Sequence, residues 1–233
     1  IQMPLTRNLC SSDSNALSRM WLAIEATARR WRRAALRTLF RQTILEGDRL
    51  ASSFPDIRVF GNDLYDFRRK YFRRYLGAGF SISTAGQALN HHYRYLAAQG
   101  LIRFATACSQ RPVILTTIAG KTGEGFQLAL RQLPDSCLEG ELKVALSDAD
   151  GCELYRALVT VISHHGQPHL FVGCFQGASG ESTLDKMRQA TNELFHRRPR
   201  EVLLQLLQGL ADALGCTGLI LASSEGRPGA PRQ

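Results

Sequence analysis

The sequence lacks any run of about 18 apolar residues, the length that a membrane-spanning helix needs. Residues 1–15 also lack the basic-then-apolar order of a secretory signal. The six cysteines are scattered and form no C-x-x-C pair, which argues against a disulfide framework and a zinc knuckle. We therefore expect a cytoplasmic protein with reduced thiols and no bound metal.

Acidic residues are scarce in the first half of the chain. Residues 1–100 hold 16 Lys and Arg against 7 Asp and Glu, whereas residues 101–233 hold 13 of each. The formal charge of +9 therefore belongs to the first half. A field of this sign favours an anionic partner, which leaves nucleic acid, anionic lipid, an acyl carrier protein and a phosphate-bearing cofactor open.

Helical periodicity dominates this basic half. Apolar residues recur every three or four positions over residues 16–45, with arginines largely on the other faces, which indicates a basic amphipathic helix. Its apolar residues are Leu17, Met20, Trp21, Ile24, Ala28, Trp31, Ala35 and Leu39. A further helix is expected over residues 84–108, with a weak point at Gly100.

A second basic stretch, residues 61–76, interleaves aromatic and basic side chains. Its basic residues are Arg68, Arg69, Lys70, Arg73 and Arg74. Such a pattern can neutralise phosphates while the rings stack on bases, so the four arginines are candidate anion-binding residues. The same composition suits an amphipathic helix with its rings inward and its arginines solvated, which is the reading we favour. Binding to nucleic acid or an anionic membrane stays open.

After residue 112 the period of the pattern changes from 3.6 to 2, which marks a lobe boundary. Alternation predicts strands at residues 126–131, 142–146 and 152–162. The segment 169–175 is apolar on both faces, which is typical of a central strand. Two amphipathic helices follow, from Ser182 or Thr183 and from Arg200, and residues 219–222 form a closing strand.

These elements predict an α+β fold. A helical N-terminal half packs on a mostly antiparallel sheet, which the two C-terminal helices cover. We expect three regions, namely a basic helical region over 1–110, a sheet region over 111–224, and a disordered tail over 225–233 that is rich in Gly, Pro and Arg.

The turn Gln176-Gly177-Ala178-Ser179-Gly180 joins the central strand to the start of a helix, where free N–H groups and the helix dipole can hold a phosphate. An antiparallel meander that leads into such a turn resembles an N-acyltransferase of the GNAT type, whose turn reads Gln/Arg-x-x-Gly-x-Gly/Ala. Ser179 stands where the first Gly is expected, so an ordinary glycine-rich turn is the alternative. The likeness implies acyl-CoA or an acyl carrier protein as donor, with Gln176, Gly177, Ser179 and Gly180 at the phosphates.

Histidine and cysteine supply the other candidates. His92 and Tyr93 lie in the expected helix, and because histidine titrates near neutral pH they are the candidate catalytic pair, with a core or surface histidine as the alternative. Cys174 lies in an apolar strand without an evident base, which favours a core thiol over a nucleophile. Three further histidines flank an expected hairpin loop, Gly166-Gln167-Pro168, and favour a solvated turn over a metal site. They are His164, His165 and His169.

Several motifs occur in an order that resembles the VirK/YbjX family of bacterial proteins. They are His92-Tyr93, Glu139-Gly140-Glu141-Leu142, Phe171-Val172-Gly173-Cys174-Phe175-Gln176-Gly177, Thr191, and Arg198-Pro199 opening a leucine-rich helix. The likeness covers roughly residues 60–224. The family is a domain of unknown function, so the resemblance implies no reaction. It implies an association with virulence, with resistance to host antimicrobial peptides and with stress responses, including the response to DNA damage.

The chain departs from the family pattern after the closing strand. Family members usually continue into a further conserved segment, whereas a Gly/Pro/Arg tail follows here. Together with Ile1 at the start, this predicts a fragment or a processed product, whose site is incomplete if that segment contributes to it. Three hypotheses result, namely a VirK-like stress or virulence factor, an acyltransferase-like enzyme, and nucleic-acid or anionic-membrane binding by the basic half.

Overall fold

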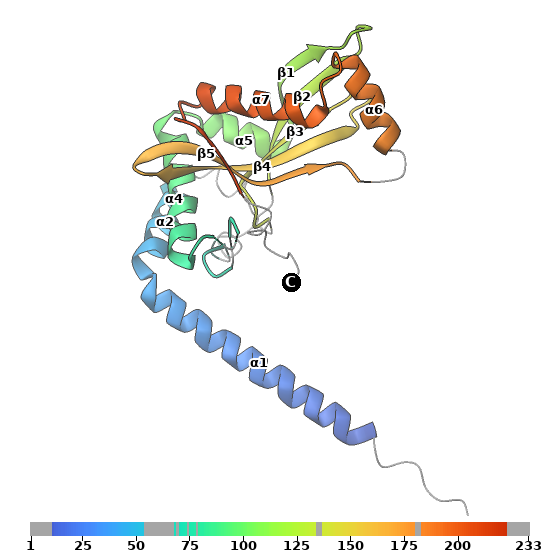
Figure 1. The fold of residues 1–233 in the computed structure, drawn as a ribbon. Helices are drawn as coiled ribbons and strands as arrows, with labels where there is room; N and C mark the ends of the chain where they lie inside the picture. The colour runs from blue at the N-terminus through green and yellow to red at the C-terminus, as the bar shows by residue number, and fades with distance from the viewer. Residues whose placement is uncertain are drawn as a thin grey trace, which may run out of the picture. The chain divides into compact units, whose positions relative to one another are not determined.

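The computed structural model describes residues 11–53, 68, 70–73, 75–77, 79–133, 137–179 and 183–222. The chain divides into two compact units, Ile1–Arg41 and Gln42–Gln233. The described part of the first unit is built on α1, Ser11–Leu39, one continuous helix (Figure 1). Phe40 is a turn residue, and α2 begins at Arg41, so the single helix predicted over 16–45 is in fact two helices.

Along the sequence, the second unit has helices before and after its strands. The helices are α2 (Arg41–Ser53), α4 (Ile82–Ala98), α5 (Ile102–Gln110), α6 (Thr183–Glu193) and α7 (Pro199–Ala213). The strands are β1 (Val113–Ala119), β2 (Gly125–Gln132), β3 (Leu142–Ser147), β4 (Glu153–His164), β5 (Gln167–Gly177) and β6 (Leu219–Leu221). All the strands predicted from alternation are present, and β1 adds a strand that the sequence pattern did not predict.

The strands form one sheet whose order follows the chain, from β1 to β6. Neighbouring strands are antiparallel from β1 to β5, and β6 lies parallel to β5. A parallel neighbour requires a crossover connection, which α6 and α7 supply (Figure 1). The predicted α+β class, with a mostly antiparallel sheet and two C-terminal helices, is confirmed.

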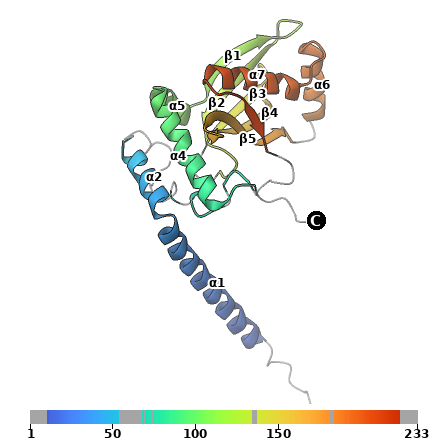
Figure 2. The same cartoon turned by 60° about the vertical axis from the view of Figure 1, so that its left-hand side comes forward.

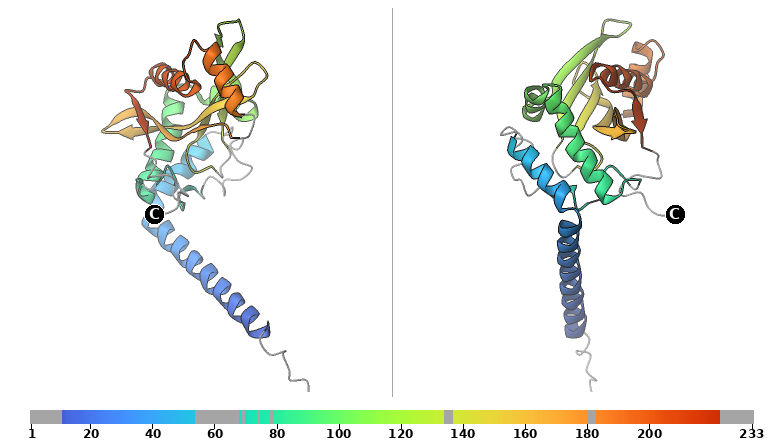
Figure 3. Two further views of the ribbon diagram at one scale, coloured as in Figure 1. Left: turned by 45° about the vertical axis from the view of Figure 1, so that its right-hand side comes forward. Right: turned by 90° about the vertical axis from the view of Figure 1, so that its left-hand side faces the viewer.

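Hydrophobic cores cover the two faces of this sheet. Successive strand residues point to opposite faces. Val159 and Leu170 pack in one core with Leu203 of α7, whereas Ile162 packs in the other with Leu89 of α4. Figures 2 and 3 accordingly show α7 and α4 on opposite sides of the sheet. β5 is buried on both faces over its middle, as predicted for a central strand.

The helix predicted over 84–108 is divided at Gly100. There the N–H of Gly100 donates to Ala97 and the N–H of Leu101 donates to Leu96, at 3.0 and 2.8 Å. This is the Schellman arrangement, in which a left-handed residue ends the helix, and Gly100 has a φ of 70°. α7 ends in the same way at Gly215, whose φ is 73°, as its place after the leucine-rich helix predicts.

Two glycines let the segment before β3 lie directly on the sheet. A Cβ on Gly173 would overlap the carbonyl oxygen of Glu139. A Cβ on Gly140 would lie 2.8 Å from backbone atoms of Leu158 and Val159, where the pairing of β4 with β5 shifts register. Such bulges re-aim side chains and recur beside functional sites. Here the bulge and the glycines position the residue that follows Gly140.

We expect Gly173→Ala to lower the unfolding free energy by about 1–3 kcal/mol, because the new methyl group forces the carbonyl of Glu139 away from β5. Gly209→Ala is the matched control. It lies in α7 with open space at the Cβ position and should raise stability by up to about 1 kcal/mol. Urea unfolding followed by circular dichroism measures both, and equal stability of the two variants would contradict the close approach.

Candidate functional site

The described part of the second unit contains a buried ion pair. Nζ of Lys70 lies 2.7 Å from Oε1 of Glu141, and neither side chain is exposed to solvent. The pair joins segments 71 residues apart, one before α4 and the other before β3. Removing two charges from water costs several kcal/mol for each, so each charge depends on the other to remain in the interior.

Two tyrosines complete the hydrogen bonding of the carboxylate. The hydroxyl of Tyr75 donates to Oε1 of Glu141 at 2.7 Å, and that of Tyr93 donates to Oε2 at 2.5 Å. Burial alone would raise the pKa of Glu141, but the Lys70 ammonium and the Tyr93 hydrogen bond outweigh it, so the pKa is lowered. Burial and the neighbouring carboxylate raise the pKa of Tyr75, which keeps this donor protonated. We call these four residues the Glu141 cluster.

The backbone of Glu141 is fixed to β4. Its N–H donates to the carbonyl of Val159 at 3.0 Å and lies 3.2 Å from Oγ1 of Thr160. The same Thr160 hydroxyl lies 3.3 Å from the hydroxyl of Tyr75. β4 therefore fixes the backbone of Glu141, and Thr160 also contacts the tyrosine that binds its carboxylate.

His92 lies beside the cluster on α4. The N–H of Val161 donates to Nδ1 at 3.1 Å, so the neutral ring carries its proton on Nε2. Within the described residues, this buried Nε2 has no hydrogen-bond partner. Burial lowers the pKa of His92 from 6.5 to about 4. The charge of Glu141 raises this pKa, and the charge of Lys70 lowers it. The ring is therefore neutral at pH 7.

Both residues of the predicted catalytic pair, His92 and Tyr93, lie close to the carboxylate of Glu141. Tyr93 binds the carboxylate, while His92 accepts from the backbone of β4, and both side chains are almost wholly buried. Their catalytic role stays a prediction. Lys70, from the same basic stretch as the candidate anion-binding arginines, is buried and paired, because the Glu141 carboxylate replaces its water.

Comparison with known sequences identifies the family. The family described as "Protein of unknown function (DUF535)" matches residues 23–228, which is well over half of the chain. The chain belongs to the DUF535 family. It is 24% identical over 203 residues to "Uncharacterized protein YbjX" of Escherichia coli strain K12, an alignment that covers 84% of this chain and 62% of YbjX. The chain therefore spans less than two thirds of that relative. No solved structure matches it.

The predicted VirK/YbjX resemblance is confirmed, and the structure shows where its motifs lie. His92-Tyr93 and Glu139-Gly140-Glu141 meet in and beside the Glu141 cluster. Gly173, from the third motif, makes room for the carbonyl of Glu139. In this DUF535 chain, three separate stretches of sequence therefore serve one buried polar group.

The phosphate-binding turn predicted in this DUF535 chain is described in part. β5 ends at Gly177, Ser179 is exposed, and Gly180 lies outside the described residues. Oε1 of Gln176 accepts a hydrogen bond from Nη2 of Arg156 at 3.2 Å. α6 begins three residues beyond Gly180, so phosphate binding at this turn stays a prediction.

The four candidate anion-binding arginines lie in different settings. Nε and Nη2 of Arg68 bind the carboxylate of Asp48 at 2.8 and 3.0 Å, a bidentate pair. Arg73 is exposed, whereas Arg69 and Arg74 lie outside the described residues. Arg68 is therefore already engaged by an acidic side chain, and anion binding by the set stays a prediction.

The β4–β5 hairpin differs from its predicted form. The loop consists of His165 and Gly166, both with positive φ, as a two-residue turn between twisted strands requires. Gln167 and Pro168, which were expected in the loop, belong to β5. Cys174 lies within β5 and is 6% exposed, in keeping with a core thiol. Among the described residues, no group of three His, Cys, Asp or Glu side chains could hold a metal ion.

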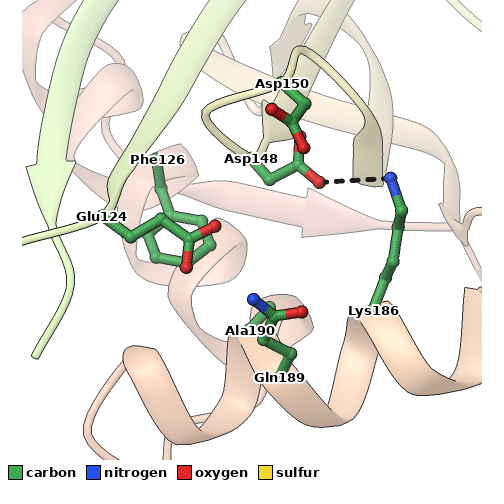
Figure 4. A pocket seen from close by; sticks show the side chains of 7 residues that line it. All are labelled: Glu124, Phe126, Asp148, Asp150, Lys186, Gln189 and Ala190. Carbon is green, nitrogen blue, oxygen red and sulfur yellow. Dashed lines mark ion pairs between the residues drawn. The ribbon is translucent and has the colours of Figure 1, made fainter. Parts of the chain in front are cut away.

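A small surface pocket lies between β2, the β3–β4 turn and α6. Its lining residues are Glu124, Phe126, Asp148, Asp150, Lys186, Gln189 and Ala190 (Figure 4). Nζ of Lys186 lies 3.6 Å from Oδ2 of Asp148 and 2.6 Å from Sγ of Cys152. Lys186 therefore offsets the acidic charge of this pocket.

We expect Glu141→Gln to cost about 3–5 kcal/mol of unfolding free energy, because it leaves the Lys70 charge buried without its counter-ion. Lys70→Met should cost a similar amount for the converse reason. The double variant should recover more than half of the summed loss, as a double-mutant cycle by urea denaturation will show. Losses that simply add would mean that the two charges do not depend on each other.

The lowered pKa of His92 makes stability depend on pH. The unfolded chain binds this proton near pH 6.5 and the folded chain near pH 4. Above pH 6.5 His92 therefore costs the folded chain no stability. Between about pH 6.5 and 5, protonation of His92 in the unfolded chain should lower the unfolding free energy by about 2 kcal/mol. The lowered pKa of Glu141 takes effect only below its ordinary 4.5.

His92→Asn keeps an acceptor for Val161 but does not titrate, so it should flatten the decline in urea unfolding measured across this pH range. His164→Asn, at an exposed histidine of the hairpin, is the control and should keep the slope. An unchanged slope in His92→Asn would show that other groups are responsible.

Proposed function

We propose that the second unit binds a phosphate-bearing acyl donor, acyl-CoA or an acyl carrier protein, at the end of β5, as GNAT-type acyltransferases do. The observation that carries this proposal is the connection from β5 through α6 and α7 to β6, which runs parallel to β5. It directs the end of β5 into the start of α6, where unpaired N–H groups and the helix dipole favour an anion.

Basic side chains beside this end of β5 support the proposal. Arg156 faces Gln176 across the β4–β5 pairing and hydrogen-bonds to it. Lys143 of β3 projects from the same face of the sheet as Arg156. Arg156 pairs with Ala145, and side chains two positions apart on a strand, such as those of Lys143 and Ala145, point to the same face. Both basic residues contact Glu153, at 2.7 and 3.3 Å. Two positive charges against one negative charge leave a local excess that suits a phosphate.

The Glu141 cluster has a different part in this proposal. Its carboxylate is fully buried, and both oxygens accept hydrogen bonds from side chains of the unit. We assign it to holding the segment of Lys70 and Tyr75 on the sheet, and assign acyl-donor binding to the end of β5. The association with virulence and stress responses stays an expectation from the family.

Thermal unfolding with CoA, acyl-CoA and acyl-loaded carrier protein tests the proposal. A ligand that binds only the folded state raises the melting temperature. We expect a rise with acyl-CoA that Ser179→Asp abolishes, because this exposed position then carries a carboxylate where the phosphates bind. Gln176→Ala should reduce the rise. The readout is circular dichroism at constant ionic strength.

Ser163→Asp is the matched control. It places the same charge on an exposed serine near the opposite end of the β4–β5 pair and should leave the rise intact. If no acyl-CoA or carrier protein alters the melting temperature, or if Ser179→Asp responds like the parent chain, the donor site is not at the end of β5.

A further inference from the structure

Four large apolar residues of α1 lie along one side of the helix and are exposed. At about 100° of rotation per residue, Met20, Trp21, Ile24 and Trp31 fall within an arc of about 100°. Their exposed fractions are 53%, 64%, 52% and 74%. A contiguous apolar surface of this kind marks a binding site for a partner or a membrane.

Positive charge occupies the other side of α1. The helix carries six arginines against Asp13 and Glu25, a net charge of +4. Four arginines fall within a second arc of about 100° that is centred almost opposite the first. These exposed residues are Arg19, Arg29, Arg30 and Arg37. Arg29 pairs with Glu25 one turn away, which leaves the excess positive.

We propose that α1 binds in the plane of an anionic lipid bilayer surface. A helix with aromatic and aliphatic residues on one face and arginines on the other inserts its apolar face among the headgroups. Tryptophan favours this interface, where its ring is buried and its N–H stays hydrated. Anionic headgroups attract the arginines. Within the described residues, no helix is long and apolar enough to cross the membrane, so α1 lies on the surface.

The spacing of the two tryptophans sets the orientation. Trp21 and Trp31 are ten residues apart, which is about 15 Å along the helix axis. Both rings can reach the same depth only if the axis lies parallel to the bilayer. α1 therefore binds along its length, over several turns, and not by one end.

Other partners fit α1 less well. A second copy of the helix would bring a charge of +4 against a charge of +4, and the small Ala28 and Ala35 on the tryptophan side would leave an uneven seam. A nucleic acid would neutralise the arginines but leave the Trp21 side in water. An anionic bilayer covers the apolar side and neutralises the basic side together. This binding requires neither an acyl donor nor the end of β5.

Tryptophan emission of the full chain tests the proposal directly. Trp21 and Trp31 are the two tryptophans of the 233-residue chain, so the emission reports on α1 alone. We expect a blue shift with vesicles of phosphatidylcholine and phosphatidylglycerol in equal parts, and none with phosphatidylcholine vesicles. Added salt should weaken the binding, because it screens the arginines.

A pair of variants separates the two sides of the helix. Ile24→Ser removes an apolar residue from the tryptophan side and should weaken vesicle binding about tenfold. Leu22→Ser is the matched control, since Leu22 is 64% exposed but lies on the arginine side. It should bind within about twofold of the parent chain. Both keep the two tryptophans, and circular dichroism checks that the helix is retained.

Several results would overturn the proposal. They are an unchanged emission with the anionic vesicles, equal binding to both kinds of vesicle, equal losses in the two variants, and a concentration-dependent blue shift without lipid. The last result would identify a second copy as the partner. A blue shift with duplex DNA in place of the vesicles would equally reject a lipid surface.

Discussion

The structure of the second unit depends on keeping one carboxylate charged in the protein interior. Glu141 receives its counter-charge from Lys70 and hydrogen bonds from Tyr75 and Tyr93, so three segments distant in sequence must meet at one point. Because an unpaired buried charge is far more costly than a missing apolar contact, the cluster tolerates few alternative arrangements. Gly140 and the bulge at Gly173 of β5 are the local means of meeting this requirement.

Local patterns predicted most of the elements, because burial of one face imposes a period on the sequence. The strands of the second half, the central position of β5 and the helix end at Gly215 follow from such patterns. β1 was missed because all seven of its residues are exposed or partly exposed, so neither face is buried. The break at Phe40 was missed because the apolar period continues through it.

The candidate site was predictable only in part. His92 and Tyr93 stood out by residue type, but nothing near Lys70 distinguishes it from the arginines beside it. Its burial is decided by Glu141, 71 residues further along, and a contact at that distance leaves no trace in a local period. The family motifs include Glu141, but the motifs alone do not explain its role. In the structure, Lys70 and Tyr93 both bind its carboxylate.

The sequence separation within the Glu141 cluster also bears on the order of folding. β3, β4 and β5 are joined by short turns, so they can pair while the rest of the chain is still unfolded. Lys70 can lose its water only once Glu141 is already held on β4, and closing so long a loop is slow. We therefore expect the segment that carries Lys70 to dock late, and its amide protons to exchange before those of the central strands.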